Sequence, residues 1–183
     1  MTAVMRRLAC LLFVLIAIPA ARADLQPLAS AAYEYRGSLY NGQTTNLDAN
    51  EARAELQELA AGPDQAAAEK LAESMLPAGH EDYQLWMSLA EIKTKLGKGL
   101  QAAYAAYLAT ENALDSGQKA KGYLALGKAL ENINRGGEAL EAYDEAIRLT
   151  QDPDARAAYT RLSRATPFHY ETFEISTANV EVN

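Results

Sequence analysis

Apolar residues in the centre of the chain recur at the spacing of helix faces. The best-defined unit covers residues 120–152, and each of its two halves carries one such group (Tyr123, Leu126, Gly127 and Leu130; Ala139, Tyr143, Ala146 and Ile147). Intervals of three and four positions place each group on one face of a helix. Asn-Arg-Gly-Gly at 134–137 is typical of a turn. The pattern predicts two short helices that pack as an antiparallel pair.

This unit has earlier copies in the chain. Its bulky and small residues have counterparts 36 or 37 positions upstream (Trp86, Leu89, Ala90, Ala103 and Tyr107). A fainter third copy places Ala67 and Leu71 another 36 positions upstream, and its first helix is expected over residues 49–60, before a turn at 62–64. Asp152 and Pro153, an N-cap and a proline at the first helical position, predict one more, capping helix.

The internal distances of the unit resemble the tetratricopeptide repeat. In that family, a bulky residue is followed by Leu-Gly or Leu-Ala and then by a second bulky residue. An Ala, an aromatic residue, a second Ala and finally a Pro come after them. The chain has Tyr-x-x-Leu-Gly-x-x-Leu from residue 123, Ala-x-x-x-Tyr-x-x-Ala from residue 139, and Pro153 two positions late. The earlier copy departs from the pattern at Lys93, a bulky position, and at Thr110, where Ala is expected.

This resemblance implies an all-α fold over residues 48–166. The fold would be an antiparallel helix-hairpin solenoid of two to three repeats plus a capping helix, in which each hairpin completes its core by stacking on its neighbours. A generic antiparallel bundle of alanine-rich helices without superhelical stacking is the alternative that the periodicity leaves open.

The resemblance also implies a binding surface. In the family, the second, fifth, ninth and twelfth positions of the first helix of each pair line a concave face that holds a partner peptide or protein. Here these positions are Gln84, Met87, Glu91, Thr94, Lys121, Leu124, Lys128 and Glu131. Two of them, Lys121 and Lys128, are two turns apart and suited to receive a peptide carboxylate. The alternative is that these two lysines serve only solubility.

The first 23 residues have the pattern of an export signal peptide. Arg6 and Arg7 precede the apolar run 8–18, and Ala-Arg-Ala at 21–23 has the small-x-small pattern of a signal peptidase site. Eleven apolar residues are too few for a spanning helix, which needs about 20. We expect cleavage after Ala23, no stable membrane insertion afterwards, and a periplasmic or secreted location. Residues 24–47 are expected to form an irregular segment.

The net charge and the cysteine content argue against several classes of partner and binding site. The chain has 17 Lys and Arg against 24 Asp and Glu, a net charge of −7. Residues 1–23 hold three arginines and no acid, so the remainder carries 14 bases and 24 acids, a net charge of −10. Such a body repels phosphate backbones, which argues against nucleic acid as a partner. The single cysteine, Cys10, excludes an internal disulfide and a thiolate metal cluster.

The sequence contains no recognisable catalytic constellation. His80 and His169 lie in different regions with no partner pattern around either, and Gly136-Gly137 lacks the strand that a phosphate-binding loop requires. Glutamates such as Glu51 and Glu55 recur at helical spacing, which is typical of solvated faces. We therefore expect no enzyme, no cofactor and no metal. The expected function is an exported module that binds a protein or peptide partner.

The last residues differ in character from the repeats. Phe-His-Tyr-Glu-Thr-Phe-Glu-Ile at 168–175 is aromatic and β-branched, and residues 179–182 alternate polar with apolar, both typical of strands. Lone strands are unstable in water, so this strand-like tail at 167–183 is expected to pair with further polypeptide, with another chain or with an edge within the helical domain.

An exported helical segment followed by such a tail resembles the start of bacterial alpha-2-macroglobulin-like proteins. That resemblance implies an alternative function, the N-terminal portion of a periplasmic protease trap. The Cys-x-x-Gln thioester of that family is absent from this chain.

Overall fold

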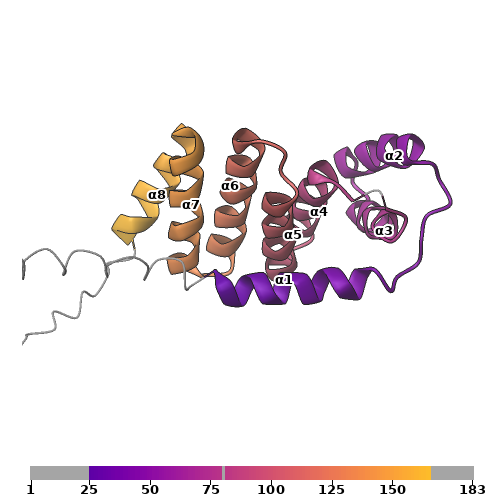
Figure 1. Cartoon of the computed structure of the whole chain (residues 1–183), viewed down its shortest axis with the longest axis horizontal. Helices are drawn as coiled ribbons and strands as arrows, with labels where there is room; N and C mark the ends of the chain where they lie inside the picture. The colour runs from indigo at the N-terminus through magenta and orange to yellow at the C-terminus, as the bar shows by residue number, and fades with distance from the viewer. Residues whose placement is uncertain (1–24, 80, 166–183) are drawn as a thin grey trace, which may run out of the picture.

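The computed structural model describes residues 25–79 and 81–165, which form helices joined by short connections. In chain order the helices are α1 (Gln26–Leu39), α2 (Ala49–Ala61), α3 (Gln65–Met75), α4 (Tyr83–Lys95), α5 (Gly99–Glu111), α6 (Ser116–Asn132), α7 (Gly136–Thr150) and α8 (Pro153–Ala165). From α2 to α8, helices that follow one another in the chain pack in antiparallel pairs, and α1 runs along one edge of this row (Figure 1). The all-α prediction is confirmed for the described residues.

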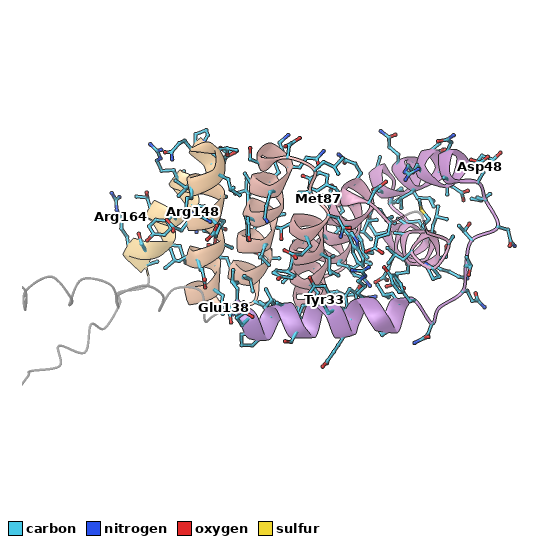
Figure 2. All side chains as sticks on the ribbon, in the orientation of Figure 1. Tyr33, Asp48, Met87, Glu138, Arg148 and Arg164 are labelled. Atoms are coloured by element: carbon cyan, nitrogen blue, oxygen red, sulfur yellow. The ribbon has the colours of Figure 1, made fainter. Side chains whose placement is uncertain are left out.

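The predicted elements divide between those the structure describes and those it does not. The helix expected over 49–60 is α2, and the capping helix expected after Asp152 is α8. The signal peptide predicted over residues 1–23 and the strand-like tail predicted over 167–183 lie outside the described residues. Figure 2 shows Asp48, before α2, at one end of the row and Arg164, on α8, at the other.

Aspartates start the first helix of each pair. The carboxylates of Asp48, Asp82 and Asp115 accept hydrogen bonds from backbone N–H groups in the first turn of α2, α4 and α6. Asp152 does the same for α8, with Oδ1 at 2.8 and 2.9 Å from two backbone nitrogens. These bonds satisfy N–H groups that have no partner within the helix. The second helices α5 and α7 instead begin after tight turns, without a side-chain cap.

Small side chains bring neighbouring helices close together. A Cβ atom on Gly127 of α6 would lie 2.4 Å from Cε1 of Tyr143 on α7, so the aromatic ring packs directly against the glycine. Gly122 of α6 faces Thr110 of α5, whose Cγ2 would lie 2.8 Å from an added Cβ. Thr110, which departs from the repeat pattern, is buried at this contact. Much of the remaining core consists of alanine, since buried alanines occur on all eight described helices.

Lys93, the other departure from the repeat pattern, is the centre of a buried ion cluster. Its side chain is almost fully buried, and its ammonium donates hydrogen bonds to Glu69 and Glu73 of α3, the latter at 2.5 Å. The same ammonium lies 5.8 Å from the ring centroid of Tyr35 on α1. Lys98 adds a second ion pair to Glu69 at 2.6 Å. The cluster therefore joins α1, α3 and α4 at one point.

The prediction of an irregular segment over 24–47 is wrong for residues 26–39, which form α1. Leu28 and Ala32 are buried, and Tyr35 packs partly buried on the core. Intervals of four and three residues place these side chains on one helical stripe. Tyr33 meets Tyr107 of α5 edge-to-face, with ring centroids 6.3 Å apart. Packing against α5 thus stabilises a helix that would be marginal alone.

A methyl group at the glycine contact tests the close packing. We expect Gly127→Ala to lower the free energy of unfolding by about 2 kcal/mol, because the added Cβ must displace the buried Tyr143 ring. Gly37→Ala is the matched control, since Gly37 is exposed on α1 with nothing within 4 Å of the added atom. The control gains roughly 0.5 kcal/mol from helix propensity. Equal effects of the two changes in urea denaturation would contradict the packing described for α6 and α7.

Removing the buried charge tests the ion cluster. We expect Lys93→Met to lower the free energy of unfolding by about 3 kcal/mol near neutral pH, because two carboxylates lose their shared partner. Lys95→Met, which removes an exposed pair with Glu91 and a hydrogen bond to the carbonyl of Ala60, is the control and costs about 1 kcal/mol.

The pH dependence of this loss has a definite sign. Burial alone would lower the pKa of Lys93, but the two carboxylates outweigh it and raise that pKa above its usual value. Burial alone would raise the pKa of Glu69, and hydrogen bonds from Lys93 and Lys98 lower it below its ordinary 4.5. The stabilisation from Glu69 is therefore present above about pH 4.5 and lost as pH falls through its lowered pKa. A destabilisation by Lys93→Met that is equally large in acid would contradict the charge pairing.

Candidate functional site

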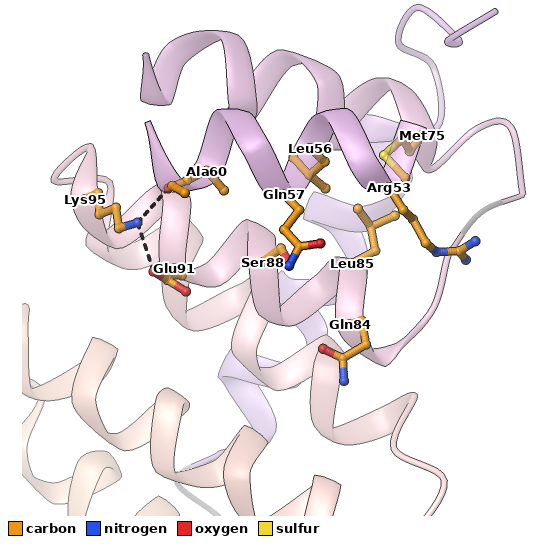
Figure 3. A pocket seen from close by; sticks show the side chains of 11 residues that line it. Arg53, Leu56, Gln57, Ala60, Met75, Gln84, Leu85, Ser88, Glu91 and Lys95 are labelled. Atoms are coloured by element: carbon orange, nitrogen blue, oxygen red, sulfur yellow. Dashed lines mark hydrogen bonds and ion pairs between the residues drawn. The ribbon is translucent and has the colours of Figure 1, made fainter. Parts of the chain in front are cut away.

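The first helices of the pairs border two neighbouring hollows. One, of about 480 Å³, lies between α2 and α4, and the other, of about 630 Å³, lies between α4 and α6. Both are lined by Gln84, Ser88 and Glu91 of α4, so the two hollows adjoin along that helix. We call the residues that line these two hollows the first-helix groove. Figure 3 shows its α2–α4 half, with Leu56, Gln57 and Gln84 among the labelled side chains.

Helical periodicity explains why one face of α4 is open while the other is buried. Gln84, Ser88, Glu91 and Lys95 recur at intervals of three and four residues and line the groove. Trp86 and Leu89 lie on the opposite side of the helix and are fully buried. On α6, intervals of four and three residues likewise place Lys121, Ala125 and Lys128 in the groove.

The structure brings most of the predicted binding residues together. Six of the eight line the α4–α6 hollow: Gln84, Met87, Glu91, Thr94, Lys121 and Lys128. Leu124 does not line the groove and packs partly buried against the core. Glu131 also lies outside the lining: Oε2 accepts hydrogen bonds from Tyr143 at 3.0 Å and Arg161 at 2.9 Å. Glu131 therefore joins α6 to α7 and α8.

The charge of the groove is opposite to that of the chain. Its lining contains four cationic side chains, Arg53, Lys95, Lys121 and Lys128, against one carboxylate, Glu91. The whole chain has a net charge of −7. Of these four cations, Arg53 and Lys95 were not anticipated as binding residues from the repeat positions.

The four cations differ in whether they already have partners. Arg53 pairs with Asp82 at 2.5 Å. Lys95 pairs with Glu91 at 2.9 Å and donates to the carbonyl of Ala60, as the dashed lines in Figure 3 show. Lys121 and Lys128, in contrast, are exposed and have no ion pair or hydrogen bond with any other residue that the structure describes. Two ammonium groups are thus open to an anionic ligand.

The opposite side of the array is less accessible. Helix α1 packs against α5, a second helix, and covers it with Tyr33 and Tyr35, whose rings contact Tyr107 and Tyr104. Part of the second-helix side is therefore closed by the chain itself. The first-helix groove, in contrast, lies open over α2, α4 and α6.

Within residues 25–79 and 81–165, no cluster of three or more His, Cys, Asp or Glu is placed to hold a metal ion. None of the helices described there is both long and apolar enough to cross a membrane.

The sequence of this chain matches no known protein-family model and no curated protein. The geometry and charge of the groove are therefore the basis on which a function is inferred.

Proposed function

We propose that the chain is an exported protein-interaction module, a short solenoid of tetratricopeptide type whose first-helix groove binds an acidic peptide segment of a partner protein. Three features support the solenoid: the repeat of 36–37 residues, the antiparallel pairs from α2 to α7, and the capping position of α8. The glycine of the Leu-Gly motif also makes the close interhelical contact, at Gly127.

The positive groove on an acidic protein is the observation that carries this proposal. Four cations and one carboxylate line the groove, whereas the chain after residue 23 carries a net charge of −10. A cleft of one sign focuses its field and attracts a ligand of the opposite sign, while the rest of the surface repels that ligand. This charge distribution therefore orients an anionic partner toward the groove as the two proteins meet.

Apolar side chains between the charges fit a peptide better than an inorganic anion. Met87, Ala125 and Ala129 line the α4–α6 hollow beside Lys121 and Lys128, and Leu56 and Leu85 line the α2–α4 hollow. Apolar side chains of a bound segment would pack there, while its carboxylates reach the two lysines. The groove crosses three helices, so it accommodates a peptide segment rather than a single small molecule.

Charge reversal in the groove tests the proposal. A random peptide library is panned on the exported chain, and the selected peptides are expected to combine Asp or Glu with apolar residues. Lys121→Glu/Lys128→Glu is expected to weaken the binding of a selected, fluorescein-labelled peptide roughly thirtyfold in fluorescence anisotropy. Each reversal costs about 1 kcal/mol of binding free energy, and 1.4 kcal/mol corresponds to tenfold.

A matched variant separates groove chemistry from net charge. Lys70→Glu/Lys119→Glu changes the net charge equally at two lysines that lie outside the groove, on α3 and on another face of α6. Peptide binding to this variant is expected to stay within about threefold of wild type, because both side chains line other hollows and their charges reach a peptide in the groove only through screening solvent. Selection of no peptide, or equal losses in the two variants, would contradict the proposed function.

A further inference from the structure

The last helix of the row presents a face of arginines. Arg156, Arg161 and Arg164 line one hollow of about 590 Å³ on the exposed side of α8, and no carboxylate of the described residues lines it with them. The buried residues of α8, Ala155 and Leu162, lie on the opposite side of the helix. This hollow shares no residue with the first-helix groove. The acidic chain therefore has a second cationic surface, at one end of the row.

The arginines of this face keep hydrogen-bond donors for a further partner. Arg164 has no ion pair or hydrogen bond with any residue that the structure describes. Arg156 donates to Oε1 of Gln151 at 2.5 Å, and Arg161 pairs with Glu131. A guanidinium has five N–H donors, so Arg156 retains several of them. Arg156 and Arg164 are therefore open to carboxylates, which guanidinium groups bind through two parallel hydrogen bonds.

The first helix of the row presents the opposite charge. Glu51, Glu55 and Glu58 of α2 recur at intervals of four and three residues, and all three are exposed. None of them forms an ion pair or a side-chain hydrogen bond with another residue in the described part of the chain. Ala52 and Leu56, the buried residues of α2, lie on a different side of the helix. The two ends of the row, α2 and α8 in Figure 1, thus carry complementary charges.

Helix dipoles do not account for this arrangement. A dipole favours acidic residues near the N-terminus of a helix and basic residues near its C-terminus. Glu51 and Arg164 follow this preference. Glu58, near the end of α2, and Arg156, near the start of α8, oppose it. Stabilisation of their own helices therefore does not explain why the charges continue along each helix.

We propose that α8 of one copy of this chain docks on α2 of a second copy, so that copies join head to tail. An antiparallel arrangement, like that of successive helices in the row, places Glu51 beside Arg164. The same arrangement places Glu58 beside Arg156. The two glutamates are seven residues apart on one helix, about 10 Å, and the two arginines are eight residues apart, about 12 Å. Both ion pairs therefore form together.

Small side chains allow the two helices to approach closely. Ala54 lies between the glutamates of α2, and Ala157 and Thr160 lie between the arginines of α8. The contact uses different surfaces on the two copies, so each copy keeps one end free and the assembly grows beyond a dimer. One helix on one helix is smaller than a standard interface, so we expect weak, salt-sensitive association. The inference does not use the first-helix groove and goes beyond the proposed function.

Sedimentation velocity of the full chain tests this docking. At low ionic strength and up to about 200 µM protein, the average sedimentation coefficient is expected to rise with concentration without levelling off at a dimer. In about 1 M salt it is expected to return to the monomer value, because the Debye length falls to about 3 Å. Glu51→Lys/Glu58→Lys and Arg156→Glu/Arg164→Glu are each expected to stay monomeric, because like charges then meet at the contact.

Mixing the two variants restores the charge complementarity. The reversed α8 of one variant is acidic and the reversed α2 of the other is basic, so an equimolar mixture is expected to associate as wild type does. Glu34→Lys/Asp144→Lys is the matched control. It changes the net charge as much as Glu51→Lys/Glu58→Lys, at exposed positions of α1 and α7, and is expected to associate as wild type does.

Four outcomes would overturn the inference. The first is a wild-type chain that stays monomeric at the highest concentration, and the second is association that persists in both reversed variants. The third is a mixture of the reversed variants that stays monomeric. The fourth is loss of association in only one of the two variants, which would assign that face to a different surface. Peptide binding in the groove is measured separately, so none of these outcomes decides the proposed function.

Discussion

The structure depends on how closely its helices approach one another. Between α6 and α7 the contact is a glycine against a tyrosine ring, and between α5 and α6 it is a glycine against Thr110. Contacts of this kind leave no room for a displaced or rotated helix, because a shift of one residue would place a larger side chain at the crossing. The inner faces of the helices are therefore fixed in rotation. Fixing the inner faces also fixes which residues of α4 and α6 line the groove.

The buried ion cluster extends this constraint to the beginning of the array. Lys93 replaces a bulky apolar residue of the repeat, and its ammonium is satisfied by Glu69, Glu73 and the face of Tyr35. A buried charge of this kind is costly unless its partners are correctly placed, so it favours one arrangement of α1, α3 and α4. Helix α1 is thereby held against α5 on the second-helix side. The two sides of the array thus differ, one covered by the chain and one open.

The sequence predicted local features better than contacts between distant segments. Helical spacing and the Asp152-Pro153 pair were sufficient to place α2 to α8, because these signals lie within one helix or turn. Helix α1 was missed although Leu28, Ala32 and Tyr35 lie on one stripe, because its stability comes from packing on α5. The partners of Lys93 could not be predicted from the sequence either, since they lie on two other helices, α1 and α3.

The candidate site was predicted only in part, because the open face of a helix is a local feature of the sequence and the contacts between helices are not. Positions within a repeat identify which face of a helix is open, and six of the eight predicted residues do line one hollow. Glu131 lies on α6 with Lys121 and Lys128, but its carboxylate accepts hydrogen bonds from Arg161 of α8 and Tyr143 of α7 and so does not line the hollow. Arg53 and Lys95 enter the groove from α2 and from the end of α4, where no repeat position was assigned.

Backbone amide chemical shifts measured by NMR test the central claim most directly, that the first-helix groove is the ligand-binding surface of this protein. The protein is titrated with a synthetic peptide of alternating glutamate and leucine. Our account predicts that the largest shift changes fall on α4 and α6, around Gln84, Glu91, Lys121 and Lys128, with small changes on α1 and α7. Changes centred on α1 and α5, or on α8, with α4 and α6 unaffected, would contradict it.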